Sequence, residues 1–266
     1  MSLIHRSIDH FRNAVKELWG LSLDFVIPWQ CTLCKTSVDE RNSTTQRVFY
    51  CRACEERLTE SVQTPQESCE RCGAILGPYV STKSGCVHCR DKPLKFDSVT
   101  CLGMYNEVLR EAILSAKYSP SAVGMQGLSQ LLIESRLDSI KAFDPDAVIP
   151  IPHHWRMRLT RHFNSSAIIA NAVAKALNMP LDDATLTRAR LTRPQKRIAL
   201  KNRFDNQKGA FRVRSPDLLK GKRVLLVDDV LTTGATCSDA ASMLKKNGAR
   251  ACCVVVIARV LDSSGA

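Results

Sequence analysis

The chain has 266 residues, a length that suits one mid-sized domain together with a smaller one. No apolar run approaches the length of a membrane span and no signal-peptide segment opens the chain, so we expect a cytoplasmic protein with no membrane span. Twelve cysteines in a chain without an export signal indicate bound metal rather than disulfides.

The formal net charge of +12 is unevenly placed along the chain. In residues 1–95, Lys and Arg outnumber Asp and Glu by only 13 to 11, whereas in residues 156–223 the count is 17 to 4. This basic window either binds polyanions such as nucleic acid, or serves a pyrophosphate-bearing substrate, or does both. A merely solvated basic surface is the alternative.

Residues 4–23 carry apolar side chains at helical spacing, which predicts an amphipathic helix within an N-terminal segment of 30 residues. Its polar face carries charges of both signs, so we expect it to pack on its own protein rather than on a membrane surface.

Four Cys-x-x-Cys pairs follow within residues 31–95, which we interpret as a separate small domain. Each such turn places two thiolates about one tetrahedral edge apart, and two turns complete a closed structural site for Zn²⁺. The gaps between the pairs allow either sequential or cross-braced pairing. A redox role for the pairs and a ligand role for His88 are the weaker alternatives. The candidate ligands of two structural zinc ions are Cys31, Cys34, Cys51, Cys54, Cys69, Cys72, Cys86 and Cys89.

Residues 96–266 alternate between strand and helix patterns, which predicts an α/β fold with a parallel sheet flanked by helices. Strands are predicted over residues 97–105, 146–151, 221–227 and 251–258. Helices are predicted over residues 108–116, 127–137, 165–177 and 237–246, the third capped by Asn164 or Ser165. Residues 186–214, basic and without clear periodicity, are predicted to form an extended or mobile arm, and the tail after residue 261 is expected to fray.

The predicted strand over residues 221–227 runs into Asp228 and Asp229, and then into a hydroxyl-rich turn and a helix. Open α/β sheets bind ligands at the carboxyl ends of their strands, and a helix N-terminus there favours a phosphate. Two acids would repel that phosphate, so we expect them to bind another part of the same ligand, such as two sugar hydroxyls. A Walker-B strand would need a Gly-x4-Gly-Lys-Ser/Thr loop, which the chain lacks.

This run resembles the phosphoribosyl pyrophosphate (PRPP) signature of type I phosphoribosyltransferases. By that resemblance the acids Asp228 and Asp229 are the catalytic candidates and hold the ribose hydroxyls. The 5′-phosphate would be held by Thr232, Thr233, Gly234, Ala235 and Thr236. With the four cysteine pairs, the chain resembles the bacterial ComF family (ComFC and GntX type), which is linked to DNA uptake in natural competence. Further similarities include Tyr105, Lys117-Tyr118 and residues 149–152.

The resemblance implies ribose-phosphate transfer from PRPP with Mg²⁺, with no residue that identifies the acceptor or the oligomeric state. Two positions depart from the family pattern, because His162 replaces a glycine and Ser165 replaces a glutamine. The candidates for pyrophosphate contact or loop closure are Arg156, Arg158, Arg161, Asn164, Arg190, Gln195 and Arg203. The alternative is a non-catalytic, zinc-containing protein that binds single-stranded DNA beside the uptake machinery, on a degenerate form of this fold.

Overall fold

The computed structural model describes residues 30–37, 49–62, 68–76, 85–152, 163–190 and 203–261. By their contacts the residues form two compact units, Met1–Glu55 and Glu56–Ala266. The helix predicted over residues 4–23 and the tail after residue 261 lie outside the described residues. The predicted division of the chain at residues 30 and 95 stays a prediction.

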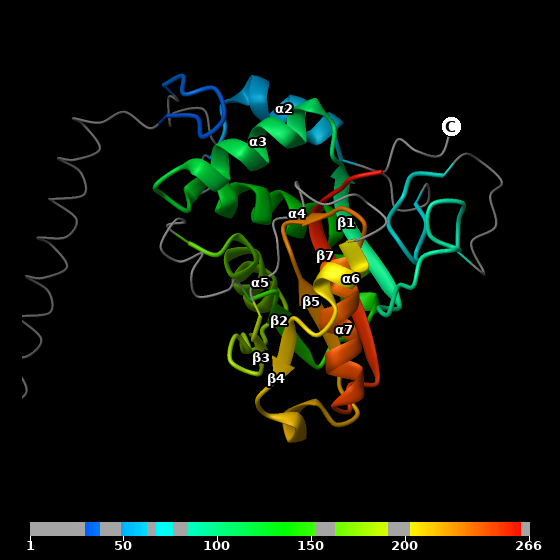
Figure 1. Cartoon of the computed structure of the whole chain (residues 1–266). Helices are drawn as coiled ribbons and strands as arrows, with labels where there is room; N and C mark the ends of the chain where they lie inside the picture. Colours follow the sequence, from blue (N-terminus) through cyan, green and yellow to red (C-terminus); the bar gives the residue numbers. More distant parts are fainter. Residues whose placement is uncertain are drawn as a thin grey trace, which may run out of the picture. The chain divides into compact units, whose positions relative to one another are not determined.

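The larger unit is built on a five-stranded parallel sheet, which confirms the predicted fold class (Figure 1). Its main path runs β1-β7-β5-β2, and the short strand β6 pairs with β7 beyond the acids. The strands are β1 (Ser98–Met104), β2 (Ala147–Pro150), β5 (Arg223–Val227), β6 (Val230–Leu231) and β7 (Ala251–Arg259). Cys252 and Cys253 are buried core residues of the last strand.

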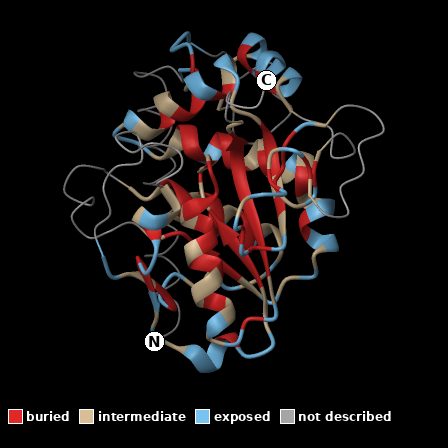
Figure 2. Cartoon of the chain, turned by 45° about the vertical axis from the view of Figure 1, so that its right-hand side comes forward, coloured by how far each residue is buried: buried red, intermediate tan, exposed pale blue. Residues whose placement is uncertain are grey.

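The buried residues are concentrated on the central strands of the larger unit (Figure 2). Val224 and Leu226 of β5 share one face, because alternate residues of a strand point the same way. They join one apolar cluster with Ala240 and Leu244, which lie on the helix that follows the acids. That helix therefore covers this face of the sheet.

Helices complete the larger unit. They are α3 (Glu107–Tyr118), α4 (Val123–Ala142), α5 (Ser165–Ala176), α6 (Arg203–Gln207) and α7 (Ala235–Lys246), with a 3-10 turn over Pro216–Leu219. The first α-helix of the described chain, α2 (Arg52–Glu60), begins beside Cys51. Helix α4 is longer than predicted at both ends. Asn164 is the N-cap of α5, since its side chain accepts from the Ser166 N–H. No described helix is both long and apolar enough to span a membrane.

The basic segment 186–214 is more ordered at its two ends than the predicted arm. Strands β3 (Leu186–Arg188) and β4 (Phe211–Val213) pair antiparallel, and Leu186 and Phe211 are buried. The Asp239 carboxylate on α7 accepts the N–H groups of Gly209 and Ala210, each at 2.9 Å. These non-local contacts stabilise strands too short to show a sequence period. Residues 191–202 lie outside the described residues.

Candidate active site and metal centres

The eight predicted zinc ligands form two clusters, each with four sulfur atoms within 4.8 Å of one another. The first cluster is Cys31, Cys34, Cys51 and Cys54; the second cluster is Cys69, Cys72, Cys86 and Cys89. The pairs therefore combine in sequence order and are not cross-braced. His88 is not a member of the second cluster.

The spacing of the sulfur atoms fits a tetrahedral metal ion. The Sγ atoms are 3.6 Å apart between Cys34 and Cys51, and 3.6 Å apart between Cys72 and Cys86. The Cys69 and Cys89 Sγ atoms are 3.9 Å apart. A Zn²⁺ ion with Zn–S bonds of about 2.3 Å has a tetrahedral edge of about 3.8 Å, whereas a disulfide is about 2.05 Å long. Four thiolates so arranged suit Zn²⁺, so each cluster can hold one ion.

The thiols of the second cluster share protons with one another. The Cys72 thiol donates a hydrogen bond that lowers the pKa of Cys69 to about 4, and the same bond raises the pKa of Cys72. The second thiol thus keeps its proton as long as the first is ionised. A Zn²⁺ ion replaces such shared protons and lets all four sulfurs bind as thiolates.

The acids Asp228 and Asp229 lie at the carboxyl end of β5, where the chain leaves the sheet. The Asp228 N–H donates to the Val255 carbonyl at 3.0 Å, and the Asp229 N–H donates to Asp228 Oδ1 at 2.9 Å. The Asp229 carbonyl accepts from the Ile257 N–H at 3.1 Å. Strand pairing on both sides of the acids therefore fixes their backbone, which orients both side chains.

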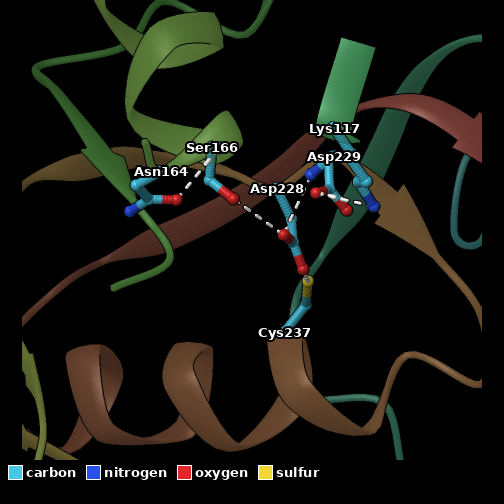
Figure 3. Close-up of polar contacts among 6 residues, drawn as sticks. All are labelled: Lys117, Asn164, Ser166, Asp228, Asp229 and Cys237. Atoms are coloured by element: carbon cyan, nitrogen blue, oxygen red, sulfur yellow. Dashed lines mark hydrogen bonds and ion pairs between the residues drawn. The ribbon is translucent and has the colours of Figure 1, made fainter. Parts of the chain in front are cut away.

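Three helices bring side chains to these acids (Figure 3). The Ser166 hydroxyl, at the start of α5, donates to Asp228 Oδ1 at 2.9 Å. The Cys237 thiol of α7 donates to Asp228 Oδ2 at 3.8 Å. In the last turn of α3, Lys117 Nζ lies 2.8 Å from Asp229 Oδ2, and both side chains are mostly buried. Residues far apart in the sequence thus converge where the parallel strands end.

Burial raises the pKa of Asp228 to about 6, and the neighbouring Asp229 carboxylate adds to the effect. The Asp229 N–H, the Ser166 hydroxyl and the Lys117 ammonium group oppose the increase, because each stabilises the ionised form. Asp228 is therefore mostly ionised above neutral pH and protonated in mild acid. Its capacity to accept hydrogen bonds depends on pH within this range.

The predicted phosphate loop, Thr232–Gly234 with Ala235 and Thr236, leads directly into α7. Gly234 has φ +84° and is the N-cap of that helix. A Cβ atom there would lie 2.9 Å from Leu94 Cδ2, so both its conformation and its neighbour require glycine. The buried Thr233 hydroxyl accepts from the Ala235 N–H at 3.4 Å. The first N–H groups of α7 and its dipole make this end suited to an anion.

The other candidates are only partly brought to the site. The Asn164 amide donates to the Ile151 carbonyl at 3.2 Å, close to Ser166 and its acid. The Arg190 guanidinium donates to the carbonyls of Asn206 and Lys208, at 2.8 and 2.9 Å, and Arg203 begins α6. Ser165 is the buried first residue of α5. Four candidates and one departure from the family pattern lie outside the described residues: Arg156, Arg158, Arg161, Gln195 and His162.

Sequence reasoning did not identify Arg188 as a site residue. Its guanidinium lies over the Phe211 ring, 5.2 Å from the centroid, and donates to Gln207 Oε1 at 2.8 Å. Burial lowers the pKa of Arg188, and the carboxylates of Asp228 and Asp239 oppose that change. Only the β3–β4 pairing places this residue near the acids, so no local signal distinguishes it from the other basic residues.

Residues 164–263 match the family model of the phosphoribosyl transferase domain. The chain is 29% identical over 210 residues to the DNA utilization protein YhgH of Escherichia coli (strain K12), covering 76% of the chain and 88% of that protein. It is 28% identical over 184 residues to Competence protein F of Haemophilus influenzae, covering 68% and 79%. A solved structure titled as the allosteric regulatory enzyme of purine biosynthesis matches with a TM-score of 0.34 and 22% identity, over 50% of this chain and 25% of that one.

The parallel sheet, the flanking helices and the family match define a phosphoribosyltransferase-type domain. The named relatives and the two four-cysteine clusters narrow the assignment. Together these findings fit a ComF-type protein.

Proposed function

We propose that this protein binds PRPP with Mg²⁺ and transfers the ribose-phosphate group to an acceptor, in a process linked to DNA uptake or use. The observation that carries the proposal is the acid pair Asp228–Asp229, placed directly before an anion-binding helix end. The link to DNA is supported by two relatives, which are named DNA utilization protein and Competence protein.

The acids and the loop would bind different parts of PRPP. The two carboxylates would accept hydrogen bonds from the 2′ and 3′ hydroxyls of the ribose, since each carboxylate has more lone-pair sites than its present partners use. The N–H groups at the start of α7 would bind the 5′-phosphate. Ser166 already holds one oxygen of Asp228, and Lys117 holds one oxygen of Asp229. Because both acids are fixed before PRPP binds, they would lose little side-chain entropy on binding.

Transfer would break the bond between C1′ and the pyrophosphate oxygen and form a bond from C1′ to the acceptor. Positive charge grows on the ribose and negative charge on the departing pyrophosphate, so positioning and electrostatics supply the catalysis. Mg²⁺, held mainly by substrate oxygens near Asp228 or Asp229, would neutralise part of the pyrophosphate charge. Among the described cations, Lys117 and Arg188 are the best placed to help neutralise the charge of the departing pyrophosphate.

Calorimetric titration of the zinc-loaded protein with PRPP and Mg²⁺ tests the proposal. We expect micromolar binding that weakens at least about a hundredfold in Asp228→Asn/Asp229→Asn, because two charge-assisted hydrogen bonds are lost. Asp217→Asn is the matched control, since its carboxylate is exposed and pairs with the exposed Lys220. Absence of binding to the folded wild-type protein would contradict the proposal.

A pocket of about 640 Å³ supports the second candidate function, binding of single-stranded DNA without catalysis. Its lining brings together the cations Arg71, Lys95, Lys245 and Lys246, beside α7. Lys245 Nζ pairs with the Asp97 carboxylate at 2.6 Å, and both residues belong to this lining. DNA binding that falls steeply with salt, persists in Asp229→Ala and weakens in Lys95→Glu/Lys246→Glu would favour this function.

A further inference from the structure

Arg259, the last residue of β7, is a buried cation outside the site described above. Only 2% of its surface is exposed, so its guanidinium must satisfy its hydrogen bonds inside the protein. The hydrogen-bond acceptors identified for it are four backbone carbonyl oxygens. A planar fork of donors suits this task, because it can reach several carbonyl groups in fixed directions at once.

These carbonyl groups belong to two different parts of the molecule. Arg259 Nε donates to the Cys72 carbonyl at 2.8 Å, which lies within the second cluster. Its Nη1 donates to the Leu231 carbonyl at 3.0 Å and to the carbonyls of Thr232 and Val260. One side chain thus joins a zinc-binding turn to the first residue of the phosphate loop.

The segment that leaves the second cluster makes an independent connection to the same loop. Leu94 and Phe96 flank the position that a Cβ atom would take at Gly234. The Lys95 N–H donates to Ser238 Oγ at 3.0 Å, in the first turn of α7. Both Arg259 and this segment therefore contact the loop or the helix turn that follows it.

The second cluster is also joined to the sheet itself. The Val99 N–H of β1 donates to the Glu70 carbonyl at 2.8 Å, and the Cys101 thiol donates to the Gly73 carbonyl at 3.6 Å. All four cysteines belong to the apolar core cluster that contains Leu231 and Cys237. A change in the conformation of the cluster must consequently be felt by the core beneath the loop.

We propose that metal bound at the second cluster sets the conformation of the phosphate loop, with Arg259 as the positioning residue, and so raises affinity for the 5′-phosphate of PRPP. The donor set fits Zn²⁺, which would fix the turn that presents the Cys72 carbonyl. Without that turn, Arg259 loses one of its acceptors and holds the loop less firmly. The ligand is the one given in the proposed function, on which this inference rests.

The test combines hydrogen exchange of the amides of residues 231–236, without ligand, with calorimetric affinity for PRPP. In Arg259→Lys the charge remains but the fork is lost. We expect two zinc ions per chain as in the wild type, at least about tenfold faster amide exchange, and about tenfold weaker binding. Arg136→Lys is the matched control, because Arg136 is also buried and donates to the carbonyls of Cys101 and Leu102. Equal effects of both substitutions would overturn the proposal.

Replacing cysteines distinguishes the two metal sites. Cys69→Ser/Cys72→Ser should accelerate loop exchange as Arg259→Lys does, whereas Cys31→Ser/Cys34→Ser should remove one zinc ion and leave the exchange unchanged. If the former variant does not fold, Arg259→Lys decides the question. Loop exchange that is unchanged in folded Arg259→Lys would overturn the inference. Because exchange is measured without PRPP, a wild-type protein that fails to bind PRPP would contradict the proposed function separately.

Discussion

The two four-cysteine clusters share one sequence signature but have different surroundings. In the first cluster, Cys34 is exposed and Cys51 is half-buried, whereas all four cysteines of the second cluster are buried. The second cluster belongs to the apolar core of the larger unit. The same ligand spacing thus gives a site close to solvent in the first cluster. In the second cluster it gives a site buried in the core of the larger unit.

The difference follows from the apolar residues near each cluster. Among the described residues of the smaller unit, the large buried apolar side chains besides the cysteines are Leu33 and Tyr50. These two side chains alone cannot offset the entropy of ordering the described residues around the first cluster, so metal would supply folding energy there. The second cluster instead packs against Leu94, Phe96 and Val99. Metal at this cluster would complete a core that already exists.

The largest expected effect is on thermal stability. Cys69→Ser/Cys72→Ser should lower the free energy of unfolding of the larger unit by about 3 kcal/mol or more, or roughly 10 °C in Tm. Scanning calorimetry of this variant and of Cys31→Ser/Cys34→Ser would measure the difference. Since the second cluster alone belongs to that unit, the latter variant should retain the main transition. Equal losses would contradict the comparison.

The next effect concerns the contact between Leu94, in the segment that follows the second cluster, and Gly234 of the phosphate loop. Gly234→Ala should destabilise the protein by about 2–3 kcal/mol, because the residue has a positive φ and its Cβ would overlap the buried Leu94. Gly221→Ala should cost only about 1–2 kcal/mol, since Gly221 has φ +71° but open space around its Cβ position. Denaturant unfolding measures both values, and identical costs would show that the Leu94 contact is unimportant.

The two clusters should release zinc at different rates. A coloured chelator should remove the ion of the first cluster at least about tenfold faster, because Cys34 is exposed and the second site requires opening of the core. Absorbance would then rise in two phases of equal size. The faster phase should be missing in Cys31→Ser/Cys34→Ser. A single phase in the wild-type protein would break the comparison.

The smallest effect is a shift in pH dependence at the acids. Protonation removes the charge of Asp228 and turns one of its oxygens into a donor, which weakens the hydrogen bond from a ribose hydroxyl. Affinity for PRPP should therefore fall about tenfold for each pH unit below about 6. Ser166→Ala removes a hydrogen bond that lowers this pKa, so its midpoint should move to higher pH by roughly half a unit. PRPP phosphates titrate nearby, but identically for both proteins. Coincident calorimetric profiles would exclude Asp228 as the titrating group.

The parts of the fold that were predictable are those with local causes. The apolar run of β5 gives a buried strand, and Gly248, with φ +106°, follows the end of α7. The eight candidate zinc ligands were predictable for the same reason, but their pairing was not, because the gaps allow both arrangements. Strands β3 and β4 depend on Asp239, which lies on a helix far along the chain.

Two side chains, Lys117 in the candidate site and Arg259 outside it, show most clearly what could not be predicted. Lys117 was noticed only through a family resemblance, and its contact with Asp229 exists only because the fold brings the end of α3 to the end of β5. In the sequence, Arg259 is simply a charged residue that follows an apolar strand pattern. Its connection between the Cys72 turn and the Leu231 carbonyl depends on three separate segments. No periodicity or spacing encodes such a contact.

The most direct test of the central claim is a crystal structure of the zinc-loaded protein with PRPP and Mg²⁺. The account predicts the two ribose hydroxyls on the carboxylates of Asp228 and Asp229, and the 5′-phosphate on the backbone N–H groups that lead into α7. PRPP bound instead in the pocket beside Lys95 and Lys246, with the acids contacting only protein groups, would contradict it.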